Sequence, residues 1–268
     1  FLIISLFLIL TIGISHGSLD HIKGKKLIKY LGYKSINVFY LGYIFIGVTT
    51  VIIWLIFPKF LLFLFLIIAA FHFGKEDSEF INRKKNFEFF YFLKGSLIIT
   101  APLFFHKRET LEIFETLNFN ISNSFIATNE ILFIFIFLSL VSSFFLSLKK
   151  NIEIKSLLLM DCLSILVLNY FLNPIIAFTV YFCFLHSVRH SISLINEINK
   201  NLKKGLPIFI KKALPLTILT IIGYIFSILI LNNYNELNET IYRVIFIGLA
   251  SLTFPHILLE YLIEKNEQ

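Results

Sequence analysis

Charged residues are scarce in this sequence. Asp, Glu, Lys and Arg make up 15% of its 268 residues, whereas soluble domains are about one quarter charged. Hydrophobic residues make up 57%, and Phe alone occurs 33 times. A soluble protein of this composition would lack the polar groups needed to cover its surface. The shortage of charge therefore predicts an integral membrane protein with most of its chain in lipid.

Cysteine is nearly absent as well. Cys162 and Cys183 both lie in apolar stretches and form no C-x-x-C motif, which excludes a disulfide-stapled fold. We expect both thiols to be buried as small apolar groups. The opening residues, FLIISLFLILTIGIS, lack a basic leader and a small-residue cleavage site, so we do not expect a signal peptide. Because the first residue is Phe1 rather than Met, we expect the sequence to begin inside a longer chain.

Apolar runs of near-spanning length fill the chain between short polar breaks. Nine such runs can be marked off, at residues 1–16, 36–57, 59–74, 87–105, 124–148, 155–172, 174–196, 207–231 and 240–262. Several are shorter than the ~20 residues that usually cross a bilayer, so eight spans are the alternative if one short run is re-entrant. The sequence thus predicts an all-α fold, a polytopic transmembrane helix bundle of about nine helices. We expect it to form a single integral membrane domain over residues 1–268.

Basic residues alternate along the connections between these nine runs. The connections at residues 22–34, 75–86, 149–155 and 197–212 are rich in Lys and Arg, and the four that alternate with them are poor. By the positive-inside rule, the N-terminus lies outside and the C-terminus in the cytoplasm. A wrong helix count would have broken this alternation. We therefore expect a multi-pass protein of the cell (inner) membrane.

Histidine is the polar residue whose placement is most informative. Under this topology six of the seven histidines fall toward the cytoplasmic side, and five of them lie at membrane depth. The five are His16, His72, His186, His190 and His256; His21 is the sixth, and His106 alone lies at the outer ends. Because imidazoles are costly in hydrocarbon, this one-sided gathering predicts a functional site.

His186 and His190 interrupt the apolar stretch FCFLHSVRHS. Their four-residue spacing places both side chains on one face of a helix, where they could bind one metal ion. A lone His-x-x-x-His is a weak signal, and a hydrogen-bonded helix–helix contact is the competing interpretation. Arg189 cannot lose its proton. It needs a partner such as Asp161 or must snorkel to the inner surface, which is the plainer interpretation.

Acidic residues follow several of these histidines. His16 and His72 each lie close to the end of an apolar run, just before a Gly, with a carboxylate a few residues further on. Metal-bound histidines usually donate their other N–H to such a group. The acids placed to accept it are Asp20, Asp77 and Glu260, although a solvated interfacial position would also explain them. We expect His256 to be an additional ligand or a supporting residue, and His21 to have a surface or supporting role.

Neutral imidazoles without carboxylate or thiolate ligands suit iron, copper or zinc. The residues alone leave three functions open. The first is an enzyme that activates O₂ at iron. The second is a transporter of a divalent metal or protons, but the outer halves of the predicted helices have almost none of the polar groups that a pathway needs. The third is a haem-binding electron carrier, which would need histidines facing each other across a helix pair.

Four motifs carry a resemblance to a known family. GISHGSLDH, FHFGKED, FCFLHSVRH and TFPHILLE resemble, in order and spacing, the signature blocks of the Brp/Blh family of bacterial and archaeal β-carotene 15,15′-dioxygenases. The similarity runs from about residue 13 to residue 260. Ser15 is a departure, because many relatives have Pro before the first histidine, but it leaves the ligand unchanged.

The resemblance implies an integral membrane enzyme that requires Fe(2+). It implies central cleavage of β-carotene with O₂ into two all-trans-retinal molecules, a product often supplied to a rhodopsin. The iron ligands that it implies are His16, His72, His186 and His190, with the metal centre itself as the catalytic group. Phe and Tyr side chains could line an apolar tunnel for the substrate, although we expect most of the 33 Phe side chains to face lipid. Tyr181 and Phe182 lie in the helix suited to that role, and no nucleic-acid partner is expected.

Overall fold

The computed structural model describes residues 1–15, 17–78, 87–119, 128–148 and 152–267. Over these residues the chain is helical with short turns and contains no strand. Nine helices in the described parts are long and apolar enough to cross a membrane: Leu2–Tyr30, Asn37–Ile56, Pro58–Glu76, Glu88–Phe105, Asn129–Ser147, Ile152–Phe171, Pro174–Ile198, Leu202–Leu231 and Leu237–Glu267. The predicted all-α bundle of about nine spans is confirmed, and each span overlaps one of the nine apolar runs.

Two segments that the sequence assigned to polar connections are helices. One is α2 (Asp20–Tyr30), which continues the first span, and the other is α6 (Lys107–Thr116). Their buried residues are Asp20, Gly24, Leu27 and Ile28 in α2, and Thr110, Ile113 and Phe114 in α6. These positions recur every three to four residues and so form one face of each helix. The lysines and glutamates occupy the other positions, which gives the segments a loop-like composition.

Large apolar side chains cover the outside of the spans. In α3 (Asn37–Ile56), Leu41 and Phe45 are each 70% exposed. In α11 (Leu202–Leu231), Leu219 and Leu229 are each 65% exposed. An apolar outer surface of this extent is unfavourable in water and suits contact with lipid. The outer surface therefore agrees with the composition in indicating a membrane protein.

The chain forms two compact units. The first unit is residues 62–186, together with Phe1, and the second is residues 2–61 and 187–268. The expectation of a single membrane domain stays a prediction.

The first unit is built around α5 (Glu88–Phe105), which packs against α7 (Asn129–Ser147) and α8 (Ile152–Phe171). The unit also holds most of α4 (Pro58–Glu76), α6 and α9 (Pro174–Val180). Serines of α7 approach the α5 backbone: Ser142 Oγ donates to the Phe90 carbonyl at 2.5 Å, and Ser139 Oγ to the Lys94 carbonyl at 3.1 Å. Small hydroxyl side chains of this kind allow close packing between membrane helices.

Two glycines bring α4 and α5 into backbone contact. A Cβ added to Gly74 would lie 1.8 Å from the carbonyl oxygen of Tyr91, and one added to Gly95 would lie 1.8 Å from that of Ala70. No side chain larger than hydrogen fits at either position without moving a helix. The crossing fixes the end of α4, where His72 and Asp77 are found.

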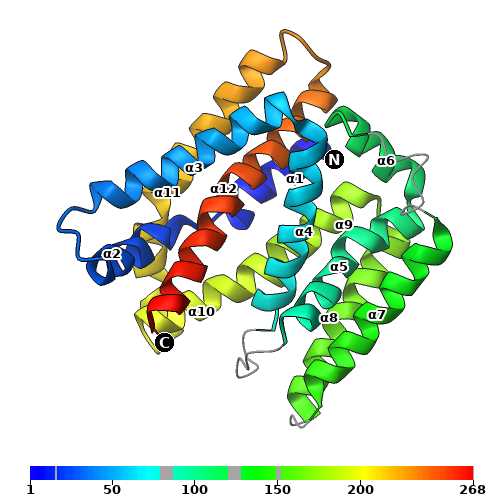
Figure 1. Ribbon diagram of the computed structural model, residues 1–268, viewed down its shortest axis with the longest axis horizontal. Helices are drawn as coiled ribbons and strands as arrows, with labels where there is room; N and C mark the ends of the chain where they lie inside the picture. Colours follow the sequence, from blue (N-terminus) through cyan, green and yellow to red (C-terminus); the bar gives the residue numbers. More distant parts are fainter. Residues whose placement is uncertain (16, 79–86, 120–127, 149–151, 268) are drawn as a thin grey trace. The chain divides into compact units, whose positions relative to one another are not determined.

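In the second unit, α12 (Leu237–Glu267) packs along α3 and against α2 (Figure 1). An apolar cluster of Leu27, Leu259 and Ile263 joins α2 to α12. Two ion pairs add to this contact, one between Lys23 and Glu260 and one between Lys26 and Glu267. The unit also contains α1 (Leu2–Leu8), α10 (Val188–Ile198) and α11, and α10 packs against α11.

Two π-helical turns interrupt the spans. One covers Ile9–Gly13, shortly before His16, and the other covers Tyr181–Ser187 and includes His186. Such turns are rare and are frequently found at functional sites. Apolar periodicity did not predict either turn, because a single extra residue per turn hardly alters the pattern of a helix that is apolar on most sides.

Candidate metal centre

Two of the predicted ligands, His72 and His186, lie together in the first unit. His72 is on α4 and 7% exposed, and His186 is in the second π-helical turn and 2% exposed. Their ring centroids are 5.6 Å apart, with the planes at 69°. The structure therefore brings these two imidazoles to one buried place from segments more than 100 residues apart in the chain.

Asp77 orients the ring of His186. One carboxylate oxygen, Oδ1, lies 3.0 Å from Nδ1 of His186, and the Tyr181 hydroxyl donates to the other, Oδ2, at 2.5 Å. An Nδ1–H that is donated to a carboxylate leaves the lone pair of the imidazole on Nε2, which is the arrangement of a metal-binding histidine. The sequence associated Asp77 with His72, whose motif it shares, but the carboxylate contact that the structure shows is with His186. The role of Asp77 toward a metal stays a prediction.

Aromatic rings enclose the same histidine. Phe73 meets the His186 ring edge-on at a centroid distance of 4.7 Å, and Phe182 stacks on it at 6.0 Å. Tyr181 and Phe182, which were predicted to bind substrate, are themselves buried. In the structure the Tyr181 hydroxyl bonds Asp77 and the Phe182 ring contacts His186. Their role toward the substrate stays a prediction.

A buried ion pair, formed by Lys94 and Asp161, contacts the backbone of Asp77. Lys94, on α5 and 4% exposed, donates from Nζ to the backbone carbonyl of Asp77 at 3.0 Å. The same Nζ lies 3.7 Å from Oδ2 of Asp161 on α8, which is 7% exposed. Asp161, considered above as a partner for Arg189, thus forms an ion pair with Lys94. Sequence reasoning missed Lys94, although a lone Lys in one span and a lone Asp in another are a detectable signal.

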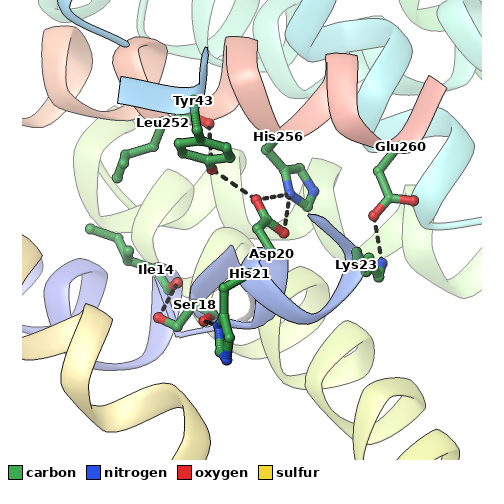
Figure 2. A network of polar contacts seen from close by, with 9 residues as sticks. All are labelled: Ile14, Ser18, Asp20, His21, Lys23, Tyr43, Leu252, His256 and Glu260. Atoms are coloured by element: carbon green, nitrogen blue, oxygen red, sulfur yellow. Dashed lines mark hydrogen bonds and ion pairs between the residues drawn. The ribbon is translucent and has the colours of Figure 1, made fainter. Parts of the chain in front are cut away.

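The second unit holds a similar arrangement around His256 (Figure 2). Nδ1 of His256 on α12 lies 2.9 Å and 2.8 Å from the two carboxylate oxygens of Asp20, at the start of α2. The hydroxyl of Tyr43 on α3 donates to Oδ2 of the same carboxylate at 2.8 Å. His190 lies in the same unit, with its ring centroid 6.4 Å from that of His256 and the planes at 87°. No sequence signal had indicated Tyr43, which lies within an ordinary apolar run.

Three other polar residues singled out in the sequence, Glu260, His21 and His106, contact groups outside the two histidine pairs. Glu260, one turn after His256, accepts from Lys23 Nζ at 2.5 Å. Nδ1 of His21 lies 3.0 Å from the Ser18 carbonyl. His106 lies beside Glu109 at the start of α6, with 3.9 Å between Nδ1 and Oε2. His16 is outside the described residues.

The donor set fits a transition metal that prefers imidazole. Among the residues that the structure describes, which exclude His16, no group of three or more His, Cys, Asp or Glu is close enough to hold an ion. Each unit nevertheless supplies a pair of neighbouring buried imidazoles, and in each pair one ring is fixed through Nδ1 by a buried carboxylate. Neutral nitrogen donors of this kind suit iron, copper or zinc.

Apolar spanning helices that bury histidine–carboxylate pairs are typical of a membrane protein with a functional site among its spans. Comparison with known proteins gives the family: the model of the family described as Beta-carotene 15,15′-dioxygenase matches residues 7–264. The chain belongs to this family, and the resemblance carried by the four motifs is confirmed. The chain is also 27% identical, over 263 residues, to the Beta-carotene 15,15′-dioxygenase of Uncultured marine bacterium 66A03, an alignment that covers 95% of this chain and 91% of that protein. No solved structure matches the chain.

Proposed function

We propose that this protein is an iron-dependent dioxygenase of the cell (inner) membrane. Its reaction is cleavage of β-carotene at the central 15,15′ double bond with O₂ to give two molecules of all-trans-retinal. Membership of the family supports the reaction class and the substrate. The observation that carries the proposal is the hydrogen-bonded chain Tyr181–Asp77–His186, because it prepares a buried imidazole to bind metal.

The proposed ligands are His16, His72, His186 and His190. The contacts inside each unit support three of them, which are buried imidazoles. Support for His16 comes from the family motif, because this residue lies outside the part of the chain that the structure describes.

When bound, Fe(2+) would supply the capacity to activate O₂ against a carbon–carbon double bond. The remaining work falls to the chain. Asp77 holds the proton of His186 on Nδ1, and Tyr181 fixes the second oxygen of that carboxylate. Phe73 and Phe182 pack on the ring and exclude water from it. No side chain is assigned as a separate acid or base, because oxidative cleavage of a hydrocarbon needs no proton transfer to a leaving group.

The membrane location suits the substrate. A C40 hydrocarbon has no polar group and partitions into the bilayer, so the enzyme would receive it from lipid. The exposed apolar faces of the spans allow this approach. The proposal also includes the orientation from the loop charges, with the histidine-rich side toward the cytoplasm. The product, all-trans-retinal, is the form that a rhodopsin in the same membrane would take up.

The test is expression in cells that accumulate β-carotene. The proposal predicts loss of orange colour and appearance of retinal. His186→Ala and His190→Ala should each abolish cleavage, because each removes one proposed ligand. His106→Ala is the matched control and should retain activity, since that residue lies beside Glu109 at the start of α6. Persistent colour with a full-length, iron-loaded protein would overturn the proposal, and equal losses in all three variants would overturn the ligand assignment.

A further inference from the structure

We propose that His256, beside His190 in the second unit, is an iron-binding residue, and that Asp20 and Tyr43 position it. This inference rests on the proposed iron-dependent function. It goes beyond the four histidines that the resemblance implies as ligands. It decides the roles that the sequence left open for His256 and Asp20, and it gives a role to Tyr43, which the sequence did not single out.

The same arrangement of side chains occurs twice in the protein, around His186 and around His256. Around His186, a carboxylate accepts from Nδ1 and a Tyr hydroxyl donates to that carboxylate's other oxygen. Around His256, Asp20 accepts from Nδ1 at 2.8 Å to 2.9 Å and Tyr43 donates to Asp20 at 2.8 Å. The first arrangement orients a proposed ligand, so the second prepares His256 for the same task.

Three helices meet to build the arrangement around His256. Asp20 comes from α2, Tyr43 from α3 and His256 from α12, and they converge on one carboxylate (Figure 2). Residues 236 positions apart in sequence make the central contact. Because Nδ1–H is donated to Asp20, the lone pair of the imidazole is on Nε2, the atom that would bind metal. His190, a proposed ligand, is the histidine next to it.

A purely structural role explains this contact less well. Asp20 and His256 are 4% and 5% exposed, and burying such groups in a membrane helix bundle is costly. The α2–α12 packing already has other support. The apolar cluster of Leu27, Leu259 and Ile263 and the Lys23–Glu260 ion pair lie on the same two helices. A polar, buried carboxylate–imidazole pair is therefore better explained by ligand orientation than by helix docking.

The decisive experiment measures Fe(2+) binding by the purified full chain in detergent, using competition with a chelator. His256→Asn keeps a side-chain N–H near the position of Nδ1 and so preserves the bond to Asp20, but it removes the imidazole lone pair. We expect iron affinity to fall at least tenfold, and free imidazole to restore it in His256→Gly. His21→Asn is the matched control, because His21 adjoins Asp20 but contacts the Ser18 carbonyl; its affinity should stay within twofold.

The positioning residues have their own test. Asp20→Asn removes the charge but keeps an acceptor, and we expect iron affinity to fall about 10–100-fold, as for other partners of metal-bound histidines. Tyr43→Phe should lower it less, while Tyr40→Phe on the same helix should leave it unchanged. A merely structural role would instead lower the melting temperature of the iron-free protein and leave affinity intact.

The outcomes separate this inference from the proposed function. If His186→Asn loses iron while His256→Asn binds it as tightly as the wild type, the function stands and the role of His256 is wrong. If the wild type binds no iron at all, the proposed function fails and this inference fails with it. An equal loss in His21→Asn would also overturn the ligand role, because any change near α2 would then suffice.

Discussion

The buried ion pair of the first unit allows a quantitative prediction. Lys94 Nζ and Asp161 Oδ2 are 3.7 Å apart, and both side chains are nearly inaccessible. At an effective dielectric constant of about 20, two unit charges at that distance attract by ~4 kcal/mol. Lys94→Met removes this attraction and leaves the carboxylate of Asp161 buried without that charge partner. We expect the free energy of unfolding to fall by about 3–5 kcal/mol, the usual cost of breaking a buried pair.

The assay is reversible unfolding of the full chain in mixed detergent micelles, followed by circular dichroism. The double variant Lys94→Met/Asp161→Leu replaces both charges with apolar groups of similar size. It should be clearly more stable than the sum of the two single effects predicts, since no isolated charge is left. Lys155→Met on α8 is the control, because Lys155 is exposed and its loss should change stability by less than about 0.5 kcal/mol.

Lys94→Met should also affect the proposed iron site. Lys94 donates to the backbone carbonyl of Asp77, whose side chain orients His186. We therefore expect the single variant to lose iron affinity as well as stability. Single variants that cost under about 1 kcal/mol, or a double variant whose effect is additive, would refute the view that the two charges support each other.

Three further predictions follow from particular contacts. Asp77→Asn should lower iron affinity about 10–100-fold in the same chelator competition, because the amide is a weaker acceptor for His186 than the carboxylate; unchanged affinity would exclude its orienting role. Gly95→Ala should lower the free energy of unfolding by about 1–3 kcal/mol or prevent folding, since the methyl group would lie 1.8 Å from a carbonyl oxygen of α4; wild-type stability would contradict the close crossing. In intact cells, Asn233→Cys should react with an impermeant maleimide and Lys200→Cys should not, because the predicted orientation places residue 233 outside and residue 200 in the cytoplasm. Background labelling should be low, since the two native cysteines are fully buried. The opposite labelling would reverse the orientation.

Much of the fold could be predicted because composition determines it. A chain with so few charges can satisfy its backbone groups in lipid only as helices or a closed barrel, and long apolar runs favour helices. The nine runs therefore correspond to the nine spans found in the described part of the chain. The amphipathic helices α2 and α6 could not be recognised by hydropathy, because half of each helix faces away from the apolar core.

The candidate site was predictable only in part, because its contacts join residues that are far apart in the sequence. The spacing of His186 and His190, and the acids after His16 and His72, are visible in short motifs. Pairings between distant segments are not. The bond between His256 and Asp20 joins residues 236 positions apart, and the Tyr hydroxyls on both carboxylates come from apolar runs without any local sign of a polar role.

The most direct test of the proposed reaction is a single-turnover measurement on the purified full chain. We expect the protein to bind iron and to convert each β-carotene molecule into two molecules of retinal in the presence of O₂. Removal of iron with a chelator should stop the reaction, and addition of Fe(2+) should restore it. Equal cleavage by the iron-free protein, or products of two different lengths, would contradict the account.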